Sequence, residues 1–557
     1  MKYNILYAAF FFLFVLSGCF KDEGKYDYLR LDAPEWKDFD PITVRAGETA
    51  KFNSASFFTW KADSAQRASE VRYEWKIGKV LLSEEASFEA PADEIIRKIG
   101  LTKFDGKEKF GTFAIIDKKT EITYMQTVIY KFIPTNASGD WFVISEKNGN
   151  TRLSFIRRNK NEQGVITYEL KEDVYPTLNG EEMQGKPLFM SYADGATNIG
   201  AMGTITVLTS QKAYEINCEN FMKVGNLEEV PINGSVILRT DAYSKGGDDG
   251  LQTFVTDENG NVYRRMMTSN NLGGAFTPEP MFLDTKGLQI SKFGQTLKGF
   301  NNIPCYDELN DRIVILLFYT SGKMDDNPWF PQPDGKQYRL SKFVSTEPAL
   351  GVSVAGCAKV WDMPDGTQPI HLWYIGAGGP PFAPYDKYGM VYNDAAGKTW
   401  LTEFAVNQKS GATMNDGGNK NIEFPGGDLE KDACVLASSC MFEPYYNKMN
   451  FILYSKGNEV RYLSRGQNLK DNAYIRLEDP NDRVTFMAWS SAFSYANLVV
   501  CTQNGKVIFY DASISNNSST SNPLIENPKV VAEFDLGGRV VSAKELDNMV
   551  SYSTDKY

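Results

Sequence analysis

His371 is the one histidine in the chain, and this limits the chemistry that its side chains could perform. A single histidine cannot build a two-histidine zinc site or an HExxH protease motif. A Ser-His-Asp triad would have to use His371, which lies in the apolar stretch QPIHLWYIG, where a packed or hydrogen-bonded histidine is more common than a catalytic one. We therefore expect no catalytic residue, no metal site and no cofactor.

Cysteine usage leads to the same expectation. Apart from Cys19, the cysteines are scattered and contain no C-x-x-C pair, which argues against a zinc ribbon and against a dense disulfide framework. Cys434 and Cys440 are close enough in sequence to pair, although two free thiols are the simpler interpretation.

Two stretches rich in aromatic residues are the candidates for a ligand-binding surface. Aromatic side chains bury a large area at low entropic cost, and they can stack on sugar rings or grip the side chains of a peptide. The alternative is that they pin long loops by packing on the body of the protein. The candidates are Trp329 and Phe330 in SGKMDDNPWFPQPDGKQY (321–338), and Trp373, Tyr374, Phe382, Tyr385 and Tyr388 in LWYIGAGGPPFAPYDKYG (372–389).

The elements that would position these residues are mainly strands. Residues 92–103 could form a short helix, whereas most apolar segments alternate or run for four to six residues between turn residues. Seven segments share one pattern, a strand, a polar turn and a second strand, which is typical of a hairpin. They are residues 141–156, 205–219, 251–267, 303–318, 389–404, 449–464 and 498–513.

The hairpins start 46 to 86 residues apart. This spacing is close to the ~40–50 residues of a four-stranded propeller blade once loop insertions are allowed. Blades arranged around an axis cover one another, which a lone hairpin cannot do. The repeat predicts a β-propeller of about seven blades over residues 140–557. A second β-sandwich with hairpin extensions is the alternative, and the number of blades could differ by one.

Residues 31–133 are expected to form a separate all-β unit. AKFNSASFFTW (50–60), VRYEWKIGKVLL (71–82) and GTFAIIDKKTEITYMQTVIYKF (111–132) are all typical of strands or hairpins. The Tyr73-x-Trp75 pattern resembles a PKD or immunoglobulin-type sandwich, in which a buried tryptophan packs between the sheets. The Gly-Asp-Gly turn common in PKD domains is missing after Trp75, and a generic β-sandwich is the alternative.

The N-terminus resembles that of a bacterial lipoprotein. Lys2 precedes an apolar run, Ile5 to Leu16, that is too short to span a bilayer and suits a signal peptide, residues 1–18. Leu16-Ser17-Gly18-Cys19 resembles a lipobox, whose cysteine carries the lipid. Residues 19–30 would be the tether, and Lys21, Asp22 and Glu23 resemble a short acidic signal for export to the cell surface. The alternatives are an ordinary secretory signal and a merely solvated tether.

The charge composition limits the kinds of molecule that the protein is expected to bind. The chain carries 59 basic and 70 acidic residues, a formal net charge of −11, and contains no basic block. Nucleic acid is therefore not an expected partner, because phosphate binding needs a concentrated Lys/Arg footprint.

LSGCFKDEGKYDY at the start, the sandwich to about residue 133 and GDWFVISEKNGNTRLSFI at the first hairpin together resemble the PKD-like family of outer-membrane lipoproteins. The resemblance implies an accessory lipoprotein of a TonB-dependent importer that works with a lid lipoprotein, anchored in the outer membrane and facing the cell exterior. It implies nutrient capture without catalysis, and oligopeptides are the favoured ligand. A glycan-binding lipoprotein and a propeller glycoside hydrolase, which would need two suitably spaced carboxylates, are the alternatives.

Overall fold

The structure is a computed structural model that describes most of the chain from residue 33 to residue 546. It forms two compact units: the first ends at Phe132, and the second comprises Lys103–Asp105 and the chain from Ile133 onward. The predicted signal peptide and tether, with Cys19, Lys21, Asp22 and Glu23, lie outside the described residues. The described residues are 33–60, 64–101, 104, 108–133, 139–160, 165–193, 204–218, 221–226, 244–246, 252–257, 259–266, 276–294, 302–317, 342–349, 353–379, 384–408, 410–437, 451–490, 497–512, 524 and 527–546.

The first unit is a β-sandwich. Its largest sheet has the strand order β2-β9-β8-β5-β6, and two smaller sheets pair β1 with β4 and β3 with β7. The elements are β1 (Glu35–Trp36), β2 (Ile42–Arg45), β3 (Thr49–Asn53), η1 (Ser54–Ser56), β4 (Phe58–Thr59), α2 (Ser64–Glu70), β5 (Val71–Ile77), β6 (Val80–Ser83), β7 (Ser87–Pro91), α3 (Ala92–Lys98), β8 (Glu108–Asp117) and β9 (Thr123–Ile133). Helix α3 occupies the first part of the helix predicted over 92–103.

Trp75 is the centre of the sandwich core, as the sequence predicts. Residues on β5 alternate between buried and half-buried, and Trp75 is 0% exposed. Its ring lies 4.2 Å from that of Phe113 on β8 and 5.7 Å from that of Phe52 on β3, measured between ring centroids. The indole Nε1 donates a hydrogen bond of 2.9 Å to the carbonyl of Glu85. The tryptophan therefore joins the two layers.

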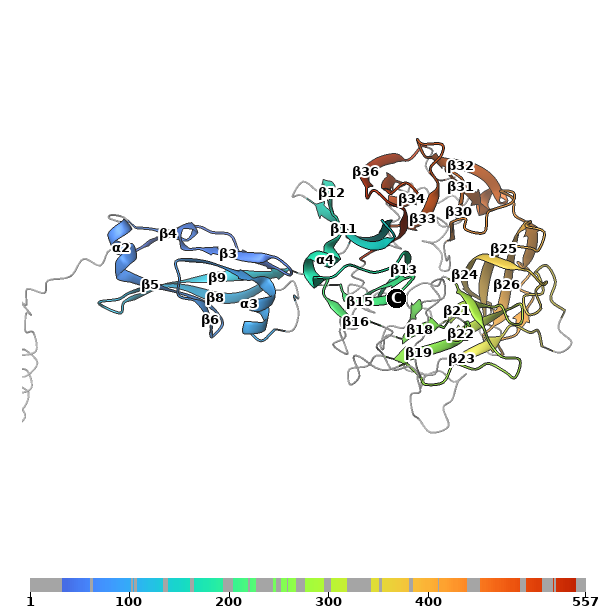
Figure 1. The fold of residues 1–557 in the computed structure, drawn as a ribbon, viewed down its shortest axis with the longest axis horizontal. Coiled ribbons are helices and arrows are strands. Elements are labelled where there is room, and N and C mark those ends of the chain that lie inside the picture. Colours follow the sequence, from blue (N-terminus) through green and yellow to red (C-terminus); the bar gives the residue numbers. More distant parts are fainter. Residues whose placement is uncertain are drawn as a thin grey trace, which may run out of the picture. The chain divides into compact units, whose positions relative to one another are not determined.

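The second unit is a β-propeller, whose described strands form seven antiparallel sheets set in a ring (Figure 1). Blade 1 contains β12 (Ile166–Lys171), β11 (Asn150–Lys160), β10 (Trp141–Lys147) and β37 (Val540–Glu545). Blade 2 contains β13 (Pro187–Ala193), β14 (Thr204–Thr209), β15 (Ala213–Asn217) and β16 (Lys223–Asn226). Blade 3 contains β17 (Ser244–Gly246), β18 (Gln252–Thr256) and β19 (Val262–Met266). Helix α4 (Val174–Asn179) connects blades 1 and 2.

The remaining blades follow in sequence order. Blade 4 contains β20 (Ile290–Phe293), β21 (Asn302–Asp307), β22 (Arg312–Leu317) and β23 (Lys342–Ser345). Blade 5 contains β24 (Gln368–Gly378), β25 (Tyr385–Asn393), β26 (Thr399–Asn407), β27 (Thr413–Met414) and β28 (Lys420–Glu423). Blade 6 contains β29 (Val435–Ala437), β30 (Phe451–Lys456), β31 (Glu459–Ser464) and β32 (Lys470–Arg476), with the turn η7 (Arg465–Gln467). Blade 7 contains β33 (Val484–Trp489), β34 (Asn497–Thr502), β35 (Lys506–Asp511) and β36 (Lys529–Asp535).

The C-terminal strand closes the ring. β37 pairs with β10, the strand that opens the propeller, with Trp141 opposite Glu545 and Ile144 opposite Ser542. β37 thereby becomes the first strand of blade 1, the one nearest the centre. The first strands of neighbouring blades contact each other in succession, including β29 with β33, β33 with β37 and β37 with β13. Closure of this kind removes an exposed sheet edge.

The predicted propeller is confirmed. Each of the seven hairpins read from the sequence forms the second and third strands of one blade. These are the middle strands, which neighbouring blades cover on both faces, and every residue of β14 and β21 is buried. None of the helices in the described residues is long and apolar enough to cross a membrane.

Candidate functional site

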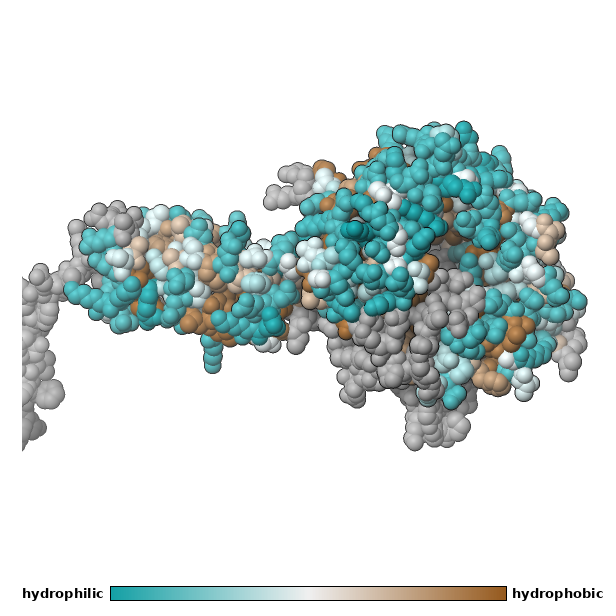
Figure 2. All heavy atoms as spheres, viewed as in Figure 1, coloured by the Kyte–Doolittle hydropathy of each residue, from teal (hydrophilic) through white to brown (hydrophobic). Residues whose placement is uncertain are grey.

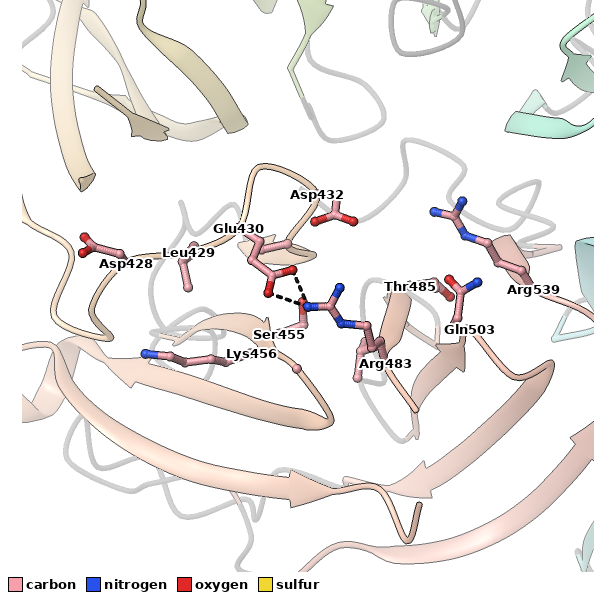
Figure 3. A pocket seen from close by; sticks show the side chains of 13 residues that line it. Asp428, Leu429, Glu430, Asp432, Ser455, Lys456, Arg483, Thr485, Gln503 and Arg539 are labelled. Atoms are coloured by element: carbon pink, nitrogen blue, oxygen red, sulfur yellow. Dashed lines mark hydrogen bonds and ion pairs between the residues drawn. The ribbon is translucent and has the colours of Figure 1, made fainter. Parts of the chain in front are cut away.

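A pocket of about 140 Å³ lies where the chain enters the first strands of blades 6, 7 and 1 (Figure 3). In Figure 2 the visible surface of blades 6 and 7 is mostly hydrophilic. Polar and charged side chains likewise dominate the pocket, which is lined by Asp428, Leu429, Glu430, Asp432, Ala433, Ser455, Lys456, Gly457, Arg483, Val484, Thr485, Gln503 and Arg539.

Hydrogen bonds between backbone groups, and between the backbone and two hydroxyl side chains, hold the segments of the pocket together. The segment before β29 is tied to the end of β30, because Ser455 N donates to Cys434 O and Cys434 N donates to Ser455 Oγ, both at 2.8 Å. The turn between β34 and β35 is tied to the start of β33, because Gln503 N donates to Arg483 O at 2.8 Å. The start of β33 is tied to β37, because Thr485 Oγ1 donates to Val540 O at 2.6 Å. Three blades thus build one rigid rim.

The pocket carries charges of both signs. Asp428, Glu430 and Asp432 come from the connection between β28 and β29, and Lys456, Arg483 and Arg539 come from the surrounding segments. Several of these charges already have partners: Glu430 forms an ion pair with Arg483, Lys456 Nζ donates to Gly426 O at 2.9 Å, and Asp428 Oδ1 accepts from Thr399 N at 3.0 Å.

Arg539 and Asp432 differ from the other charged residues of the pocket. In the part of the chain that the structure describes, neither side chain takes part in a hydrogen bond or ion pair, and both are exposed. Figure 3 shows both side chains among those that line the pocket. One guanidinium and one carboxylate are therefore available to a ligand.

The backbone beneath Arg539 is closely packed. Glu146 N on β10 donates to Arg539 O at 2.8 Å. A Cβ at Gly538 would lie 1.8 Å from Glu146 O, so only glycine allows this approach of two backbones. On the other side, Leu536 N donates to Gly505 O at 2.9 Å. The backbone of Arg539 is therefore held in place, next to the turn that contains Gln503.

Trp373 and Tyr374, two of the predicted ligand-binding aromatics, are core residues. The stretch 372–389 is mostly strand, since it forms the end of β24 and the start of β25 rather than a long loop. Trp373 is 0% exposed in the interface between blades 5 and 6, and a Cβ at Gly389 would lie 2.2 Å from its ring. Tyr374 is 1% exposed in the interface between blades 4 and 5.

Of the other predicted aromatic residues, some pack on the propeller and the rest lie outside the described residues. Tyr385 is half-buried on β25 and its ring packs over Gly378, while Tyr388 on the same strand is 1% exposed. The described aromatic residues of this stretch therefore pack on the body of the propeller, which is the alternative given in the sequence analysis. Trp329, Phe330 and Phe382 lie outside the described residues.

His371 is a packed residue. Its ring stacks on that of Trp373 at 5.5 Å between centroids, and burial, with a contribution from the Lys292 ammonium, lowers its pKa to about 3. The imidazole is therefore neutral at physiological pH. Cys434 is a free thiol whose pKa burial raises to about 12, and Cys440 lies outside the described residues. Among the described residues no group of three His, Cys, Asp or Glu side chains could hold a metal ion.

The pocket is not among the sites predicted from the sequence. Its residues lie in short polar segments just before the first strands, such as DLEKDA (428–433), NDR (481–483) and GGR (537–539). Each segment is an ordinary turn by composition. A signal does exist, because each segment contains a charged residue close to the start of β29, β33 or β37. It can be recognised only once the first strands are known.

Comparison with known proteins gives one family. Residues 19–187 match the model of the PKD-like family. This part of the chain is similar to the proteins of that family. The match begins at Cys19 and continues beyond the sandwich through β10, β11 and β12 of the propeller, so it includes β10, the strand with which β37 closes the ring. The predicted resemblance to this family is confirmed over these residues. No curated protein matches the chain.

Solved structures with a similar arrangement are distant in sequence. The periplasmic gluconolactonase PpgL of Pseudomonas aeruginosa is 10% identical with a TM-score of 0.39, covering 74% of this chain and 100% of its own. AztD from Citrobacter koseri is 11% identical with a TM-score of 0.31, covering 78% and 94%. A mutant of the Synechocystis apocarotenoid oxygenase is 9% identical with a TM-score of 0.36, covering 74% and 94%. At this level of similarity their activities say nothing about this chain.

Proposed function

We propose that this protein is a non-catalytic surface lipoprotein that captures oligopeptides for a TonB-dependent outer-membrane importer and its lid lipoprotein. In this proposal Cys19 carries the lipid anchor, Lys21, Asp22 and Glu23 direct the chain to the cell surface, and the propeller presents the binding site. The PKD-like match, which starts at Cys19, supports the family setting of the proposal.

The charges that line the pocket at blades 6, 7 and 1 support a peptide as the ligand. The pocket offers an available guanidinium, Arg539, and an available carboxylate, Asp432. A peptide carries a free C-terminal carboxylate that can compensate Arg539, and it can carry a basic side chain that compensates Asp432. A neutral oligosaccharide would cover them without an opposite charge, and covering an uncompensated charge is costly. The pocket therefore favours a peptide over a neutral glycan.

The lipid anchor explains how a protein with such a site would stay at the membrane. Each buried methylene contributes about 0.8 kcal/mol, and one acyl chain alone anchors only marginally. The several chains of a bacterial lipoprotein would hold the mature protein stably. Lipidation of Cys19 can be checked by mass spectrometry of the N-terminal peptide of the mature protein, which should carry diacylglyceryl and acyl groups.

One described carboxyl group, that of Asp386, has a property that a glycosidase requires, but it lies outside the pocket. A glycosidase needs one carboxyl held protonated as a general acid. Among the described residues, burial raises the pKa of Asp386, but this residue is buried on β25, accepts hydrogen bonds from Asn302 and Gln408, and does not line the pocket.

Calorimetric titration of the mature protein tests the choice of ligand. The probes are a pool of tetrapeptides with free termini and a pool of neutral oligosaccharides. We expect saturable binding of the peptides, weakened by Arg539→Ala and unchanged by the control Arg476→Ala, whose guanidinium pairs with Glu459 on the outer part of blade 6. Binding of the oligosaccharides alone, or turnover of either pool, would overturn the proposal.

A further inference from the structure

We infer that the pocket recognises the C-terminal residue of its ligand, whose free α-carboxylate binds the guanidinium of Arg539. This inference rests on the proposed function, because it specifies how a peptide occupies the site.

The size of the pocket limits what can enter. Pockets that enclose a whole small-molecule ligand measure ~300–1,000 Å³. At about 140 Å³ this pocket has less than half of that space. An oligopeptide could therefore insert only one end, while the rest of its chain would run over the surface. A site for one end is also compatible with many sequences, since it need not contact the interior residues of the ligand.

Arg539 is suited to a carboxylate. A guanidinium presents its N–H groups as a planar fork that binds a carboxylate through two parallel hydrogen bonds. In the described part of the chain, the Arg539 side chain forms no hydrogen bond or ion pair that would occupy those N–H donors. The close approach of Gly538 to Glu146, and the hydrogen bond from Glu146 N to Arg539 O, fix the base of the side chain. Less ordering is then needed on binding.

The other arginine of the pocket is less suited. Arg483 is already paired with both carboxylate oxygens of Glu430. A ligand carboxylate would have to displace Glu430, so the net gain at Arg483 would be small. Arg539 is therefore the position for the terminal carboxylate.

Asp432 adds a preference for the side chain of the terminal residue. Its carboxylate lines the same pocket as Arg539 (Figure 3). A basic C-terminal side chain would meet an opposite charge there, whereas an acidic one would be repelled. We expect C-terminal Lys or Arg to bind better than C-terminal Asp or Glu.

The test compares one tetrapeptide pool in three forms: free at both ends, amidated at the C-terminus, and acetylated at the N-terminus. Binding is measured by calorimetry with the full mature chain. Amidation removes a charge-assisted bidentate contact, so we expect a loss of affinity of about 10- to 100-fold. Acetylation should change the affinity by less than about twofold. Arg539→Ala should lower the affinity for the free acid by a similar factor and abolish the difference between acid and amide, whereas Arg476→Ala should preserve both.

The outcomes separate this inference from the function on which it rests. Equal binding of acid and amide, or a loss caused by acetylation instead, would overturn the inference while peptide capture stands. Failure of all three forms to bind would overturn both. Because Arg539 is exposed, the variant should fold, and a melting curve that coincides with that of the parent checks this.

Discussion

Trp373 lies in the interface between blades 5 and 6, whereas Arg539 stands at the rim of the pocket formed by blades 6, 7 and 1. Trp373 belongs to a sequence segment rich in aromatic residues, glycine and proline, which is typical of a binding loop, yet it is fully buried. Arg539 follows two glycines in an ordinary turn, yet it is available to a ligand. The difference shows that residue type indicates a site only when the position in the ring is known.

The largest expected effect that distinguishes the two regions is on stability. Trp373→Ala would leave a cavity between two blades, and such truncations cost about 3–5 kcal/mol. Denaturant unfolding should show this loss. Trp373→Phe keeps an aromatic ring and removes an indole N–H that has no hydrogen-bond partner in the described part of the chain, so it should cost much less. A Trp373→Ala variant that unfolds like the parent but no longer binds peptide would instead make Trp373 a ligand contact.

His371, which stacks on Trp373, should make the stability of this interface depend on pH. The folded protein holds the pKa of His371 at about 3, below the ordinary ~6.5, so between these values the unfolded chain binds the extra proton. Stability should therefore fall as the pH drops below about 6.5, by up to about 1.4 kcal/mol per unit. Urea unfolding of the parent and of His371→Phe at pH 7, 6, 5 and 4 isolates this contribution. Parallel pH profiles would show that burial does not hold the imidazole neutral.

At the pocket, a substitution should change peptide affinity more than it changes stability, the opposite of what is expected at Trp373. Arg539→Ala removes an exposed side chain, and such changes usually stay within about 0.5 kcal/mol of the parent. Its effect should appear in peptide affinity, which calorimetry measures. If the variant lost several kcal/mol of stability, Arg539 would belong with Trp373 as a structural residue, and the contrast between the two regions would disappear.

The smallest expected effect concerns the exposed ion pair at the pocket. Glu430 and Arg483 are largely solvent-accessible, so their coupling should contribute about 0.2–1 kcal/mol at most. A double-mutant cycle with Glu430→Gln and Arg483→Gln measures it by denaturant unfolding, and added salt should weaken it. A coupling of several kcal/mol would mean that the pair holds the rim of the pocket together.

The sequence predicts the second and third strands of each blade, but little of the first and outermost strands. β14 and β21 are buried along their whole length, so their apolar runs are visible in the sequence. The outer strand β36 is mostly exposed and the first strand β29 has three residues, and neither leaves a comparable signal. Trp75 could be predicted as a core residue because the alternation on β5 is local information.

The pocket could not be predicted for a different physical reason. Asp428 and Arg539 are separated by more than a hundred residues, and they line one pocket only because β37 returns to pair with β10. For Trp373 the local signal pointed the wrong way, because the Gly-Pro cluster that follows it suggested a loop where β24 in fact continues to Gly378.

The proposed partnership with an importer can be tested by purifying the native lipoprotein from membranes and identifying by mass spectrometry everything that accompanies it. The proposal predicts a TonB-dependent transporter in the purified complex, with oligopeptides bound. Recovery of the protein without any transporter, or with oligosaccharides in place of peptides, would contradict it.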